Sequence, residues 1–76
     1  MMRDLRLGTV GRIDQGIDIG RYVEVLDDFD ASGGYLIVTY DRPDRVGNAY
    51  DSWVESIVDV ELYFDEAGWE ISWLDS

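Results

Sequence analysis

The alternation of apolar and polar positions along the chain predicts a hairpin at its centre. The longest apolar run, Gly33–Asp41, is bounded by glycines on one side and by Arg42 and Pro43 on the other. Such a run between turn signals is typical of a strand with both faces at least partly covered, so we expect it inside the sheet. Arg21–Leu26 precedes it with the period-two pattern of a half-exposed strand. The two strands are expected to pair antiparallel.

Two further strands are predicted nearer the ends of the sequence. Leu5–Leu7 alternates and opens the first, while Gly8 and Gly11 interrupt the segment up to Ile13 and indicate a bulge or bend. Trp69–Trp73 forms the last, with its large apolar side chains on one face. Because each tryptophan can bury on the order of 200 Å², this short strand is expected to supply a large share of the core.

The segment Asp51–Gly68 carries both a helical and a strand pattern. Ser52 with Glu55 three residues later forms a capping box, and Gly68 occupies the position of a C′ glycine. A helix would also carry one apolar stripe, which consists of Trp53, Ile57, Val60 and Phe64. The strand pattern rests on four alternating apolar residues, Val58, Val60, Leu62 and Phe64. We predict a helix here.

With a helix over Asp51–Gly68, the chain is expected to form an α+β fold. Three or four strands would make a mainly antiparallel sheet with one helix packed on a face, in the order β-β-β-α-β. With a strand there instead, the alternative is an all-β, five-stranded small barrel resembling SH3 or OB folds. The 76 residues make a single domain, 1–76. Because a chain of this size buries only about 60% of its unfolded surface, it has little room for a deep pocket.

Several kinds of chemistry are excluded by composition. The chain has no cysteine and no histidine, so disulfides, thiolate or imidazole metal sites and Ser-His or Cys-His nucleophiles are absent. Paired carboxylates for glycoside hydrolysis must face each other across a cleft, and no pair stands out. We expect a protein that is not an enzyme, with no catalytic residues and no cofactor. The sequence shows neither a signal peptide nor a membrane-spanning segment, and a cytoplasmic location is the expectation.

Net charge gives the clearest indication of a partner. The chain carries −11, with −3 in residues 1–45 and −8 in residues 46–76, where no basic residue occurs. Such a field repels nucleic acid and anionic membranes and attracts basic proteins. Solubility alone, or adaptation to high salt, would give the same composition. The sequence leaves these alternatives open, together with the oligomeric state.

The segment Asp28–Gly33 matches the first half of a calcium-binding loop. Asp28, Asp30 and Ser32 supply oxygen donors at the first, third and fifth positions, and glycine follows at the sixth. The twelfth position is Thr39, where a bidentate glutamate is required. We therefore expect a hairpin loop whose aspartates bond the local backbone, and no metal site.

Aromatic residues beside acids in the base-free half form the candidate partner-binding site. Its residues are Tyr50, Asp51, Trp53, Glu55, Asp59 and Glu66. On a helix the four acids would follow one another at intervals of four, four and seven, and like charges so placed repel one another. A basic partner would supply the missing counter-charges. For Trp53 taken alone, a place in the core is favoured, because tryptophan is highly buried on average.

Three segments, together with the acidity, resemble the immunity proteins of bacterial toxin systems. These segments are Gly33–Leu36, Tyr50–Glu55 and Gly68–Trp73. The resemblance implies a cytoplasmic bacterial inhibitor that neutralises a toxin, often a basic nuclease, by binding it with an acidic face. Inhibitors that mimic nucleic acid have the same composition, and the alternative to both is a small interaction module without inhibitory function, which binds peptides or is assisted by calcium.

Overall fold

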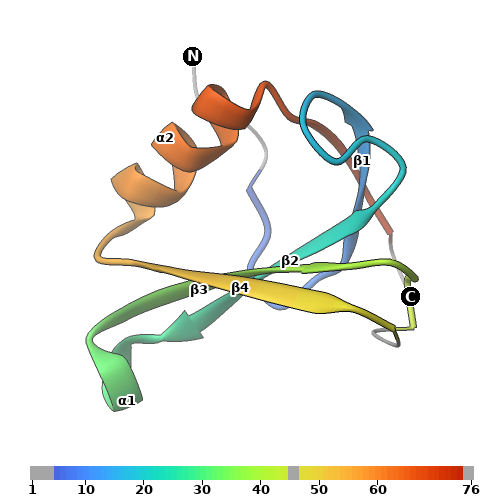
Figure 1. Ribbon diagram of the computed structural model, residues 1–76. Coiled ribbons are helices and arrows are strands. Elements are labelled where there is room, and N and C mark those ends of the chain that lie inside the picture. Colours follow the sequence, from blue (N-terminus) through green and yellow to red (C-terminus); the bar gives the residue numbers. More distant parts are fainter. Residues whose placement is uncertain (1–4, 45–46, 75–76) are drawn as a thin grey trace.

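Five strands and two helices make up the computed structural model, which describes residues 5–44 and 47–74 (Figure 1). The strands are β1 (Gly11–Gln15), β2 (Tyr22–Asp28), β3 (Gly34–Tyr40), β4 (Ala49–Val54) and β5 (Glu70–Trp73). The helices are α1 (Phe29–Ser32), a single turn between β2 and β3, and α2 (Ile57–Ala67), between β4 and β5. The sequence predicts a polar loop over Asp41–Tyr50, but β4 already begins at Ala49, and residues 45 and 46 lie outside the described part.

All five strands pair antiparallel in one sheet, in the order β4-β3-β2-β1-β5. The first four follow one another as a meander, and α2 then carries the chain back so that β5 lies beside β1 (Figure 1). The α+β class with one helix packed on the sheet is confirmed. The barrel alternative is wrong, because the sheet stays open with β4 and β5 as its edges. The predicted hairpin of the second and third strands is confirmed in β2 and β3.

One face of the sheet packs against α2 to form the core. Its buried residues are Ile13, Val23, Val25 and Ile37 of the sheet, Val60 and Phe64 of α2, and Trp69. The Trp69 ring meets Phe64 edge-on, with 5.0 Å between centroids. Such aromatic pairs contribute roughly 0.5–1.5 kcal/mol beyond their area. Trp69 lies one residue before β5, and Ile71 and Trp73 of the strand are partly buried at the margin of the core, so β5 itself supplies less of the core than its pattern predicts.

Helix α2 begins after Ser56, and the predicted start at Asp51 is wrong. The Ser56 side chain accepts a hydrogen bond from the Asp59 N–H at 3.2 Å, which makes it the N-cap. Residues 51–54 instead form part of β4, where they pair with β3. The predicted C′ glycine is correct: Gly68 has φ 69°, and its N–H reaches the Asp65 and Phe64 carbonyls.

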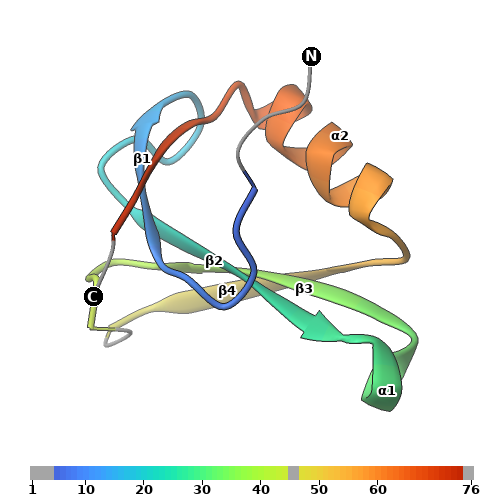
Figure 2. The same cartoon turned by 180° about the vertical axis from the view of Figure 1, so that it is seen from behind.

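The first strand also begins later than its pattern predicts. The sequence predicts an opening strand at Leu5–Leu7, but β1 starts at Gly11, and Leu7 makes only an isolated parallel bridge to Val25. Gly8 has φ 72°, so the chain turns there before it enters β1. Figure 2 shows this segment in blue, descending beside β2 and then turning into β1.

The turn at residues 16–20 docks onto the end of α2. The Ile17 N–H donates to the Ala67 carbonyl at 2.9 Å, and the Trp69 indole N–H donates to the Ile17 carbonyl. A side chain at Gly16 would meet the Ala67 and Gly68 carbonyl oxygens. This close approach fixes the carboxy-terminal end of α2 to the turn between β1 and β2. The flank of α2 that faces β4 stays accessible.

Candidate partner-binding groove

A groove of about 400 Å³ lies between α2 and the edge strand β4. We call it the α2–β4 groove and define it by its lining residues, Trp53, Val54, Glu55, Asp59, Leu62, Tyr63 and Glu66. Four of the six residues predicted from the sequence, Trp53, Glu55, Asp59 and Glu66, are therefore brought together.

The geometry of α2 explains why these helical residues share one flank. Val60 and Phe64 are fully buried against the sheet. With 3.6 residues per turn, Asp59, Tyr63 and Glu66 then fall on the side of the helix next to β4. The Tyr63 hydroxyl lies 3.2 Å from Ser52 Oγ of β4, and this hydrogen bond joins helix and strand across the groove.

Trp53 borders the groove from the opposite face of the sheet. Ile37 points into the core, so its neighbour Leu36 and the Leu36 partner Trp53 point away from α2. A Cβ at Gly34 would come within 2.7 Å of the indole, which therefore lies directly over that glycine. The indole N–H donates to Ser32 Oγ of α1 at 2.9 Å. The expected core position is wrong: Trp53 is 49% exposed, because it stands on a strand and not on the helix.

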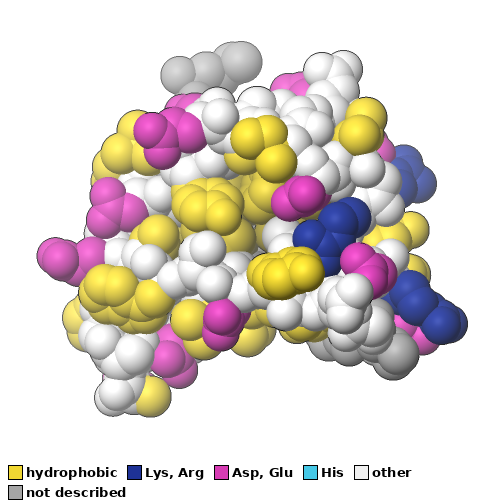
Figure 3. Space-filling model, viewed as in Figure 1, with side chains coloured by type: hydrophobic (Ala, Val, Ile, Leu, Met, Phe, Trp, Pro, Cys, Tyr) yellow, Lys and Arg dark blue, Asp and Glu magenta, His cyan; other side chains and the backbone are white. Residues whose placement is uncertain are grey.

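The carboxylates of the groove have no cationic partner among the described residues. Glu55, Asp59 and Glu66 form no ion pair with any of them. Ion pairs elsewhere join Arg12 to Asp14 (2.7 Å), Arg21 to Asp41 (3.1 Å) and Asp18 (3.8 Å), and Arg42 to Asp44 (3.3 Å). In Figure 3 the basic side chains gather at the right, whereas the charged side chains seen at the left are all acidic. On this face the charge asymmetry of the sequence is also an asymmetry of the surface.

Tyr50, also predicted for the site, lies outside the groove. Its ring packs on the guanidinium of Arg21, with 5.2 Å from Cζ to the ring centroid. Arg21 also donates to Asp41 at 3.1 Å and to the Asn48 carbonyl at 3.0 Å. Tyr50 therefore belongs to an arginine-centred cluster that anchors the start of β4.

Asp51, the sixth predicted residue, also lies outside the groove lining. It stands in the middle of β4, opposite Val38, and its side chain is on the face turned away from α2. Asp51 and Trp53 share this face, so Asp51 extends the acidic surface around the edge of the sheet.

Sequence patterns missed three lining residues, Val54, Leu62 and Tyr63. The sequence does contain one useful signal: Ser56 is followed three residues later by Asp59, a capping pattern like that of Ser52 and Glu55. A helix that starts there turns Asp59, Leu62 and Glu66 to one side. Leu62 is 51% exposed, and Val58, one turn earlier, is 64% exposed. This flank of α2 is thus apolar as well as acidic.

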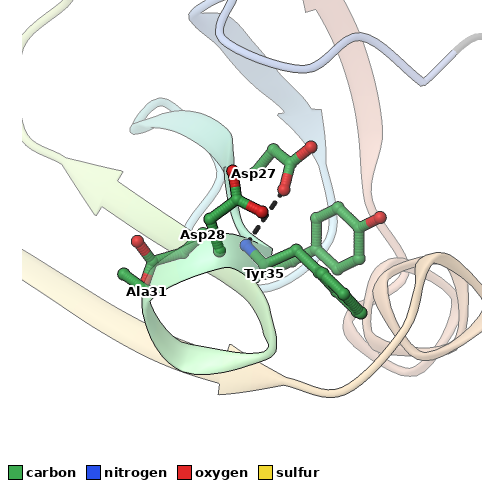
Figure 4. A pocket seen from close by; sticks show the side chains of 6 residues that line it. Asp27, Asp28, Ala31 and Tyr35 are labelled. Carbon is green, nitrogen blue, oxygen red and sulfur yellow. Dashed lines mark hydrogen bonds between the residues drawn. The ribbon is translucent and has the colours of Figure 1, made fainter.

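A second hollow, of about 610 Å³, lies around α1 where the sequence resembles a calcium loop (Figure 4). It is lined by Asp27, Asp28, Phe29, Asp30, Ala31 and Tyr35. Asp27 Oδ1, one residue before the segment, accepts a hydrogen bond from the Phe29 N–H at 3.0 Å. Asp28 itself is the N-cap residue of α1 and makes no side-chain cap hydrogen bond. Among the described residues, no three potential metal-ligating side chains are grouped to hold an ion.

Within residues 5–44 and 47–74, no helix is both long and apolar enough to cross a bilayer. Comparison of the chain with protein families, with characterised proteins and with solved structures finds no match. Function is therefore inferred from the groove itself.

Proposed function

We propose that this protein is a non-enzymatic inhibitor that binds and neutralises a basic partner protein, such as a toxin or a nucleic-acid enzyme. The observation that carries the proposal is an exposed apolar groove rimmed by carboxylates that form no ion pair with any described residue. Lysine or arginine side chains of the partner would supply the counter-charges. The resemblance to immunity proteins, and the likeness in composition to nucleic-acid mimics, point to the same class of partner.

Apolar and charged groups would have different tasks in such a complex. Exposed apolar side chains with a polar rim mark interaction sites. Leu62 and Trp53, together with the partly buried Tyr63, supply this surface. The surrounding carboxylates would steer the encounter, since charge complementarity mainly sets the association rate and specificity.

The test compares two triple variants that change the net charge equally. The partner is sought among the products of neighbouring genes, by whether co-expression of this protein relieves their toxicity. Glu55→Gln, Asp59→Asn and Glu66→Gln together should slow association by about tenfold or more and flatten its dependence on salt. The matched control, Asp30→Asn, Glu61→Gln and Glu70→Gln, removes three acids that do not line the groove, and association should slow much less. Equal effects of the two triples, or association that ignores salt, would contradict the proposal.

A further inference from the structure

The main-chain N–H and C=O groups of β4 point alternately toward β3 and away from the sheet, and the hydrogen bonds of the neighbouring strands fix which residues point outward. The Val25 carbonyl accepts from the Gly8 N–H, on the side of β2 away from β3. Along β2 the direction alternates, so Glu24 and Leu26 bond toward β3 and pair there with Val38 and Leu36.

The same alternation continues through β3 to the edge. Ile37, between Leu36 and Val38, bonds toward β4, where its partner is Ser52. The neighbours of Ser52, Asp51 and Trp53, therefore direct their N–H and C=O groups away from the sheet. The Val54 carbonyl agrees with this assignment, because a Cβ at Gly34 of β3 would meet it.

We infer that the outer edge of β4 accepts an extended, lysine- or arginine-rich segment of the partner as an additional antiparallel or parallel strand. The inference rests on the proposed function and deepens it, since it names how a basic partner is held. Exposed sheet edges bind extended peptides through main-chain hydrogen bonds, and flanking pockets select the alternate side chains.

Both faces of such an added strand would meet suitable groups. Side chains on its α2 face would enter the α2–β4 groove, beside Tyr63 and the acids Asp59 and Glu66. Side chains on its other face would lie next to Asp51 and the indole of Trp53, where a cross-strand basic residue pairs with the carboxylate. A strand with basic residues on both faces therefore fits this edge.

Charge also decides against the other obvious occupant, a second copy of this chain. Two copies would each bring a charge of −11, and edge-to-edge pairing would place the acids beside β4 against each other. Natural edge strands are commonly protected by lysine, proline or a bulge. β4 has the sequence AYDSWV, which contains no lysine or proline, and it pairs with β3 in continuous register, without a bulge. Its one charged residue is Asp51. A carboxylate repels acidic strands and attracts basic ones.

The first experiment uses a short peptide of alternating lysine and valine as the probe. A second peptide has the same sequence with every backbone amide methylated, so it keeps the charge but cannot donate strand hydrogen bonds. The unmethylated peptide should bind about tenfold or more tightly than the methylated one. Amide exchange should slow on binding at Asp51 and Trp53, with little change at Ser52 and Val54, which already bond β3.

The second experiment uses two variants of the protein. Asp51→Pro and Asp51→Asn both remove the carboxylate, but only proline removes the outward N–H, and proline is tolerated at such edge positions. Asp51→Pro should bind the probe about fivefold to tenfold more weakly than Asp51→Asn. If Asp51→Pro does not fold, the comparison with the methylated peptide and the pattern of amide exchange still test the inference.

Equal binding of the two peptides, exchange protection elsewhere than on β4, or no saturable binding would overturn the inference. A separate result tests the proposed function. If binding of the lysine-valine probe is unchanged in the triple variant Glu55→Gln, Asp59→Asn and Glu66→Gln, the acids of the groove do not select a basic partner.

Discussion

Asp14 shows how one side chain can join strands that are far apart in the sequence. Its carboxylate accepts a hydrogen bond from Arg12 on β1 at 2.7 Å and another from the Ser72 hydroxyl on β5. These bonds favour the ionised form, so the pKa of Asp14 lies below its usual value, chiefly through Arg12 and then through Ser72. The ionised Asp14 carboxylate therefore contributes to the pairing of β1 with β5.

Stability should depend on pH through Asp14 in a defined direction. A carboxyl whose pKa is lower in the folded state stabilises the protein above its unfolded pKa of about 3.9, and this contribution is lost as the pH falls through the folded value. Asp14→Asn should therefore lower the urea midpoint at pH 7, and the difference from the unmodified protein should shrink in acid. The control is Asp30→Asn, on the exposed turn α1. A difference that persists unchanged at pH 2 would contradict this account.

Single residues also show where local patterns fail to place a side chain. The aromatic and acidic character of Tyr50–Glu55 is evident from the sequence, but the direction of Trp53 depends on whether the segment is a helix or a strand. Strand pairing turns Trp53 away from α2 and places it over Gly34. No local signal specifies that contact, because Gly34 belongs to a different strand.

Among the elements, α2 carries the largest share of the core outside the sheet. Val60 is fully buried, whereas Val58, two residues earlier on the same helix, is 64% exposed. The two valines differ in burial and not in chemistry, so they form a matched pair.

Val60→Ala should lower the free energy of unfolding by about 2–3 kcal/mol, because it removes buried methyl groups and leaves a cavity. Val58→Ala should change it by less than about 0.5 kcal/mol, since alanine is a good helix former and little area is lost. Urea denaturation of both variants measures the difference. Similar losses at the two positions would mean that α2 packs in a different orientation.

The elements were predictable wherever local signals and tertiary pairing agree. Gly33–Asp41, the hairpin with Arg21–Leu26 and the C′ glycine Gly68 are all confirmed. Ser52 and Ser56 are both followed by an acid three residues later, so either could cap a helix. β3 decides between them, because residues 49–54 pair with it and occupy an edge that would otherwise be open. This pairing depends on the whole sheet, so a short window of sequence does not predict it.

Across the whole molecule, charge of one sign is concentrated on one half. The base-free segment 46–76 supplies both α2 and β4, so its repulsion acts within the folded state as well as toward partners. Self-repulsion of this kind destabilises a compact protein until salt screens it.

The melting temperature should therefore rise as NaCl increases from low concentration to about 0.15 M, where the screening length falls to about 8 Å. The triple variant Glu55→Gln, Asp59→Asn and Glu66→Gln should show a smaller rise, because three of the repelling charges are gone. A fall in melting temperature with salt would show that the ion pairs of the amino-terminal half dominate. A rise that continues into molar salt would favour salt adaptation as the origin of the acidity.

The pairing of β5 with β1 joins residues as distant in sequence as Gly11 and Trp73. The meander of β1 to β4 can form as soon as each strand follows its neighbour during synthesis, but β1 keeps an open edge and Phe64 lacks Trp69 until residues 69–73 have left the ribosome. Contacts between distant segments also form more slowly than those between neighbours. A nascent chain that stops short of Trp69 would therefore carry an incomplete core and expose the edge of β1, which β5 covers in the finished protein.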